Sequence, residues 1–116
     1  MKQFHIVTIV AAALVAGCSC DPHITVPISE IDGLTEPRAL ELTRSALRAA
    51  GLDADSFTPI PYWPDSPSLF ASNRMDPETG YVLWKDAAHD SGLVWDYSVS
   101  IRRHDDKAVI TVRRPK

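Results

Sequence analysis

Histidine, serine and aspartate occur together in one short stretch, residues 86–91, and are the residue types of a hydrolytic triad. Asp86, His89 and Ser91 lie within six residues of one another. Triads are assembled in space from separate elements, and neighbours along a chain seldom point at one another. The chain also lacks the Gly-x-Ser-x-Gly motif of a nucleophile elbow. The stretch therefore predicts a polar loop. A small hydrolase remains a hypothesis about function, ranked below the two that are given at the end of this subsection.

Thiol chemistry is confined to two cysteines, Cys18 and Cys20. Asp21 and His23 follow closely and add a carboxylate and an imidazole. A tetrahedral zinc site needs three or four ligands in a suitable geometry, and the stiffening Pro22 interrupts this group. We therefore expect no metal and no cofactor.

The residues before Cys18 have the pattern of an export signal. Lys2 supplies a positive start, and residues 4–15 form an apolar run with only two polar interruptions. Twelve residues are too few to span a bilayer as a helix, which takes about 20, but they suit the apolar region of a signal peptide. Ala16 and Gly17 then give a peptidase access to the backbone, and the Cys18 thiol is a nucleophile for thioether formation.

Residues 14–18, Leu-Val-Ala-Gly-Cys, resemble the lipobox of bacterial lipoproteins, although Val15 stands where leucine is commoner. The resemblance covers residues 1–18 only. It implies that residues 1–17 are a signal peptide, that Cys18 is acylated, and that the bilayer is a partner of the periplasmic product. Ser19 in place of Asp favours the outer membrane over the inner one. An ordinary secretory signal and an uncleaved N-terminal anchor are the alternatives.

Composition and charge describe an ordinary globular chain with an uneven charge distribution. Removal of residues 1–17 leaves 99 of the 116 residues, enough for one modest core. Residues 18–96 carry a net charge of −8 and residues 97–116 a net charge of +4. The basic end could bind anions, or it could be a hairpin kept soluble by its charge. Because an exported protein rarely meets nucleic acid, we expect no nucleic-acid partner.

The first part of the exported chain predicts one helix between two irregular segments. We interpret residues 18–34 as a tether, although the alternation at 24–26 would let it dock as a short edge strand. Residues 35–50 predict a helix, with Thr35 as its cap and Gly51 as its left-handed stop. Residues 52–68 contain four prolines and therefore cannot form a central strand.

The remaining chain predicts four strands, at about 69–75, 81–85, 94–103 and 108–112. A two-residue loop at Asp105-Asp106 pairs Ile101 with Ile110 and places the apolar residues of both strands on one face. The predicted fold class is therefore α+β. Residues 35–116 form a single domain in which one helix packs on a four-stranded antiparallel sheet, in the order α-β-β-β-β.

Aromatic and basic residues supply the predicted partner contacts. The stiff Pro-rich segment displays Tyr62 and Trp63, which either contact a partner or cover the sheet. The polar sheet face carries Arg102 and Arg113, whose guanidinium groups suit carboxylates. Three further aromatic residues are expected in the core: Trp84, Trp95 and Tyr97.

Two other hypotheses precede the hydrolase. The first is a non-enzymatic envelope lipoprotein that binds or scaffolds a protein partner. The second is an inhibitor or immunity-type lipoprotein that neutralises a toxin or a cell-wall hydrolase, which the small size, acidic body and stiff aromatic segment would suit.

Overall fold

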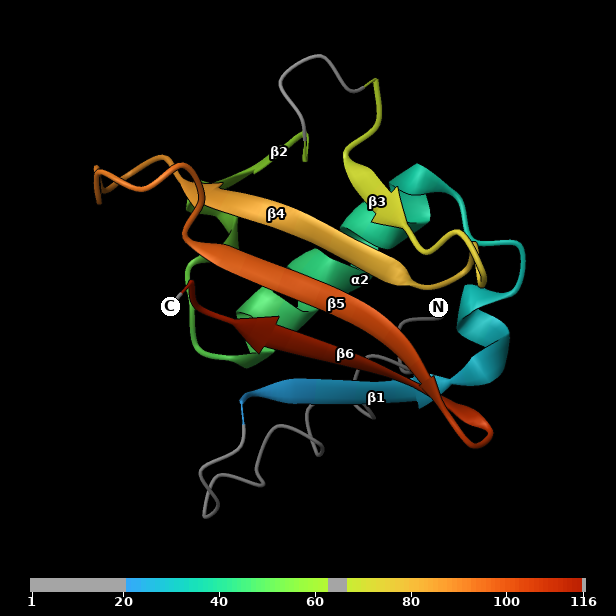
Figure 1. Cartoon of the computed structure of the whole chain (residues 1–116). Coiled ribbons are helices and arrows are strands. Elements are labelled where there is room, and N and C mark those ends of the chain that lie inside the picture. Colours follow the sequence, from blue (N-terminus) through green and yellow to red (C-terminus); the bar gives the residue numbers. More distant parts are fainter. Residues whose placement is uncertain (1–20, 63–66, 116) are drawn as a thin grey trace.

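The computed structural model describes residues 21–62 and 67–115. A single α-helix of this part, α2 (Glu36–Ala49), packs behind a six-stranded antiparallel sheet (Figure 1). The strands lie in the order β1-β6-β5-β4-β2, and β3 also pairs with β4. Their bounds are β1 (His23–Pro27), β2 (Phe57–Ile60), β3 (Phe70–Ser72), β4 (Gly80–Asp86), β5 (Tyr97–His104) and β6 (Lys107–Arg113). The α+β class is confirmed, but the predicted four strands are six.

The prediction that residues 18–34 are a tether is wrong from His23 onwards. β1 pairs with β6 along its whole length, and the 3-10 helix η2 (Ile28–Ile31) follows it. Ile24 and Ile31 are fully buried, so these apolar residues stabilise a docked edge strand rather than a free linker. Proline has no backbone N–H, and Pro27 is tolerated because the N–H groups of the even-numbered residues are the ones directed at β6. The hydrogen bond from Ile28 N to Asp106 O shows this direction.

The predicted helix is confirmed at both ends. The Thr35 side chain accepts a hydrogen bond from Arg38 N, and Gly51 adopts the left-handed conformation that ends the helix. Small and branched residues of one stripe face the sheet: Ala39, Leu42, Thr43, Ala46 and Leu47. The stripe lets α2 lie close to the strands.

The Pro-rich segment 52–68 is an edge rather than a wholly irregular region. It contains the 3-10 helix η3 (Ala54–Ser56) and β2, in which Pro59 pairs with Trp84. β2 and β3 pair with successive parts of β4, so Ile60 and Phe70 lie opposite the neighbouring residues Leu83 and Val82. Together they form one interrupted edge strand along β4 (Figure 1).

The two predicted hairpins are confirmed, with shifted strand ends. β3 and β4 form the first, and β5 and β6 the second, in which Ile101 pairs with Ile110 as predicted. Asp105 adopts a positive φ of 58° in the two-residue loop. β5 begins at Tyr97 rather than at residue 94, so Trp95 precedes the strand and is only half-buried.

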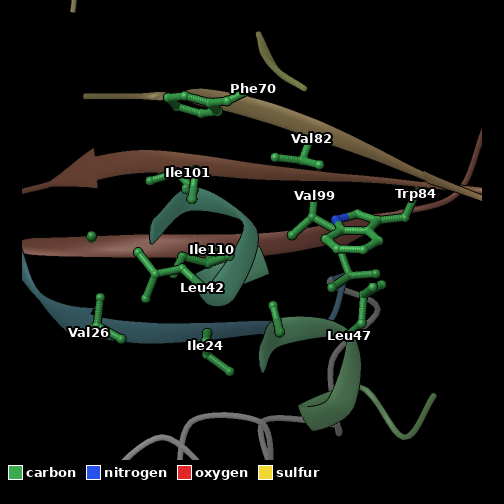
Figure 2. Close-up of a cluster of buried hydrophobic side chains, with 14 of the residues drawn as sticks. Ile24, Val26, Leu42, Leu47, Phe70, Val82, Trp84, Val99, Ile101 and Ile110 are labelled. Carbon is green, nitrogen blue, oxygen red and sulfur yellow. The ribbon is translucent and has the colours of Figure 1, made fainter. Parts of the chain in front are cut away.

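The core is the layer between the sheet and α2. Figure 2 shows side chains of five strands gathered against Leu42 and Leu47 of the helix. Trp84 is the largest fully buried side chain, and its indole Nε1 donates to Thr43 Oγ1 over 3.2 Å. The face of the sheet turned away from α2 takes no part in this layer.

Glu36 joins the start of α2 to the chain before β3 and makes the fold sensitive to acid. Its carboxylate accepts hydrogen bonds from Leu69 N at 2.8 Å and Ser68 Oγ at 2.9 Å, which hold the pKa of Glu36 below its usual range. Because the folded-state pKa is lowered, this stabilisation is present above about pH 4.5 and is lost as the pH falls further.

We expect Glu36→Gln to destabilise the protein by about 1 kcal/mol at pH 7 in urea denaturation. Glutamine keeps an accepting oxygen but lacks the charge. The difference from the unmutated protein should shrink progressively as the pH falls below about 4.5, because this stabilisation is lost as Glu36 takes up its proton. A difference that stays constant between pH 7 and pH 3 would contradict the assigned role of the charge.

Candidate functional site

The sheet face opposite α2 carries a polar strip across β4 and β5. Tyr81 lies directly opposite Ser100, and Arg102 follows two residues along β5 on the same face. This parity follows from the buried residues Val82, Val99 and Ile101, which point towards the helix. The alternation that builds the core therefore also displays these polar side chains on the far face.

A groove of about 510 Å³ lies over this strip. Its walls come from the edge of β4, where β3 and the residues Tyr62 and Ser68 lie beside the sheet. The side chains that give it chemical character are Tyr62, Ser68, Asn73, Tyr81, Ser100 and Arg102. Gly80 forms part of the lining where β3 approaches β4 most closely.

Two tyrosines form one wall of the groove. The Tyr62 ring packs edge-on against Tyr81, with ring centroids 5.5 Å apart at an angle of 89°. Burial, together with a hydrogen bond to Tyr62, raises the pKa of Tyr81 to about 12. The Tyr81 phenol is therefore neutral at physiological pH, and the wall offers hydroxyl groups and ring edges.

Arg102 supplies the charge of the groove. Among residues 21–62 and 67–115, no acidic side chain forms an ion pair with its guanidinium group. Its neighbour Arg103 binds Asp76 and Glu78 instead, and Arg113 binds Asp21 at 3.1 Å. The acidic loops thus neutralise part of the basic C-terminal hairpin and leave Arg102 for a ligand.

The remaining polar groups favour a ligand that accepts hydrogen bonds. Asn73 Oδ1 accepts from Met75 N at 2.9 Å, which leaves the Nδ2 hydrogens to donate. The Ser100 hydroxyl can also donate, whereas the two phenols are hydrogen-bonded to each other. One permanent cation with several neutral donors and two aromatic rings suits a carboxylate-bearing group with an apolar or planar neighbour.

The structure brings together only some of the predicted contact residues. Tyr62 and Arg102 line the same groove. Arg113 shares the face but lies opposite Ser98, four residues along β6 from the partner of Arg102, a separation of about 13 Å. Trp63 and the predicted lipidation site, Cys18, lie outside the described residues.

Sequence reasoning did not identify Tyr81 or Asn73 as site residues. Tyr81 alternates with Val82 in a predicted strand, so its outward orientation was available from the pattern. Its position beside Ser100 required the register between β4 and β5, across a ten-residue loop. Asn73 belongs to the turn after β3, and no spacing rule links that turn to the groove.

The cluster around His89 lies at the other end of β4. His89 Nδ1 is 3.0 Å from Asp86 Oδ2, while Ser56 Oγ donates to the other oxygen of that carboxylate. Ala88 N and then His89 lower the pKa of Asp86. Ser91 contacts Lys85 rather than the imidazole, so Asp86, His89 and Ser91 do not align as a triad. The expectation that the chain is not an enzyme stays a prediction.

Residues 21–62 and 67–115 contain neither a metal-binding cluster nor a helix that could span a membrane. No group of three or more histidine, cysteine or acidic residues there is arranged to hold a metal ion. No helix in the same residues is long and apolar enough to cross a bilayer.

Comparison of the chain with models of known protein families, with curated proteins and with solved structures finds no match.

Proposed function

We propose that this protein is a lipid-anchored envelope protein whose domain binds a protein partner through the groove of Tyr62, Tyr81 and Arg102. The lipobox-like stretch ending at Cys18 supports the anchor, which holds the domain at the periplasmic side of the outer membrane. The domain acts as a binding or scaffolding module, and the groove receives an acidic side chain or a terminal carboxylate of the partner.

The groove is the single observation that carries the binding proposal. It occupies the sheet face that α2 leaves uncovered, and Arg102 has no acidic partner among the described residues. A guanidinium fork beside two tyrosines is the combination that is enriched at the energetic centres of protein interfaces. Tyr81 lies in the central strand β4 and Tyr62 packs edge-on against it, so both rings are positioned in advance, which reduces the entropy lost on binding.

The proposal predicts a captured partner that depends on Arg102. Crosslinking in intact cells, followed by purification of the full chain and mass spectrometry, should recover one stoichiometric protein. Arg102→Ala should lower its recovery about tenfold, because arginine truncation at an interface centre removes both charge and contact. The same spectra should show the chain starting at Cys18 and carrying acyl mass.

Arg48→Ala is the matched control, because Arg48 is an exposed arginine on α2 whose 3.5 Å ion pair with Asp55 is also exposed. It should leave the recovery unchanged. Equal recovery with Arg102→Ala would remove the groove from the proposal, and a product without acyl mass would remove the anchor.

A further inference from the structure

The loop between β4 and β5 and the start of β1 lie at the same end of the sheet. β4 ends at Asp86, and β5 begins at Tyr97, opposite Trp84. Ser98 pairs with Arg113, whose side chain binds Asp21 just before β1. The loop thus projects beyond the end of the sheet at which the chain enters its first strand (Figure 1).

The second half of this loop, residues 87–96, exposes two adjacent apolar side chains, Leu93 and Val94, and this pair is here named the tip. Val94 is 80% exposed and Leu93 49%, whereas most large apolar residues of the domain are buried. The tip is held in place, because Lys85 Nζ donates to Leu93 O at 2.7 Å and Leu93 N donates to Ser91 Oγ at 3.2 Å. Hydrogen bonds therefore hold this apolar pair in a solvent-exposed position, although apolar exposure to water is unfavourable.

The spacing from Cys18 to the domain brings this end close to any lipid on that cysteine. Asp21 is only three residues after Cys18, so the two Cα atoms lie within about 11 Å even if the chain is fully extended. The start of β5 lies two strand spacings from β1, about 10 Å across the sheet. An acylated Cys18 therefore places the loop within reach of the same leaflet.

We propose that the Leu93-Val94 tip inserts into the lipid interface and, with the acylated Cys18, fixes the domain in one orientation on the bilayer. This inference rests on the proposed function, because it requires the lipid anchor. In this orientation the end of the sheet that carries Asp21 and the loop 87–96 lies at the membrane. The groove around Arg102 and Asn73 lies towards the opposite end of the sheet and faces the partner.

The charges around the loop limit the insertion to its apolar tip. Asp86, His89 and Asp90 lie on its β4 side, and Arg113 and Arg114 lie on the neighbouring strand end. Because both signs are present, attraction to anionic lipids adds little. The tether keeps the tip at a high local concentration near the interface, so a shallow apolar contact suffices.

The test measures tryptophan quenching by brominated lipid in two variants of the acylated full chain. Val94→Trp places an indole at the tip, and Met75→Trp places one at the turn after β3, at the far end of the sheet, where Met75 is 91% exposed. Both proteins are reconstituted in phosphatidylcholine vesicles with or without bromine on the acyl chains. The signal of the unmutated protein is subtracted, because three native tryptophans contribute.

We expect brominated lipid to lower the added Val94→Trp emission about twofold, and to leave the Met75→Trp emission nearly unchanged. Flotation with the vesicles and intact mass report the anchor separately. A floating, acylated protein in which both added indoles respond equally would overturn the orientation and leave the proposed anchor standing. A protein that carries no acyl mass and does not float would overturn both.

Discussion

Gly80→Ala is expected to destabilise the domain by about 3–5 kcal/mol, because two separate strains act at one position. Gly80 has a φ of +151°, which side chains rarely allow, and an added Cβ would lie 2.2 Å from Ala71 O and 2.7 Å from Ser72 Cα. Both atoms belong to the backbone of β3, so no side-chain rotation relieves the overlap. Urea denaturation followed by circular dichroism measures the loss.

The same substitution should also impair the groove. Gly80 pairs with Ser72 on β3 and with Ile101 on β5, and it lines the groove next to Tyr81. A shift of β3 away from β4 would move Asn73 relative to Arg102. We therefore expect lower partner recovery from the fraction of Gly80→Ala that remains folded.

Gly51→Ala provides the control for backbone strain alone. Gly51 also has a positive φ, +87°, but no atom lies within 4 Å of the added Cβ. Its cost should be about 1 kcal/mol. If the two variants were equally stable, the close approach of β3 to β4 would not contribute to stability.

Local signals in the sequence predicted most of the fold. The features that were not predicted depend on pairing between residues far apart in the chain. The cap at Thr35, the stop at Gly51 and the hairpin pairing of Ile101 with Ile110 all depend on residues close together in the chain. β1 was interpreted as a tether because its five residues find their partners 80 to 88 positions later. The alternation at 24–26 allowed for a short edge strand there, but so few residues do not decide between a strand and a tether.

The candidate site was predicted in part for the same reason. Arg102 was identified from strand alternation, which requires only the local pattern. Its proximity to Tyr62 depends on β2 and β3 sharing one edge of β4, an arrangement that places Ile60 and Phe70 opposite neighbouring residues of β4. Alternation alone also grouped Arg113 with Arg102, although their places along the strands keep them apart.

Trp84→Ala is expected to reduce the free energy of unfolding by about 3–5 kcal/mol, a large share of the stability of a domain of this size. Trp84 is fully buried and fills the layer between β4 and α2. The Arg44 guanidinium carbon lies 4.6 Å from its ring centroid, and the same arginine donates to Ala54 O at 2.6 Å. Alanine would leave a cavity and remove the surface on which Arg44 rests.

Three further variants separate burial from the polar contact. Thr43→Val keeps the shape of Thr43 but removes the oxygen that accepts from Trp84 Nε1, so a buried N–H loses its partner at a cost of about 1–3 kcal/mol. In the Trp84→Ala background the same change should cost less, because no indole remains to be satisfied.

Trp95→Ala removes a half-buried indole and should cost about 1–2 kcal/mol. Equal losses for Trp84→Ala and Trp95→Ala would contradict the placement of Trp84 at the centre of the core, and additive losses in the double variant would contradict the hydrogen bond.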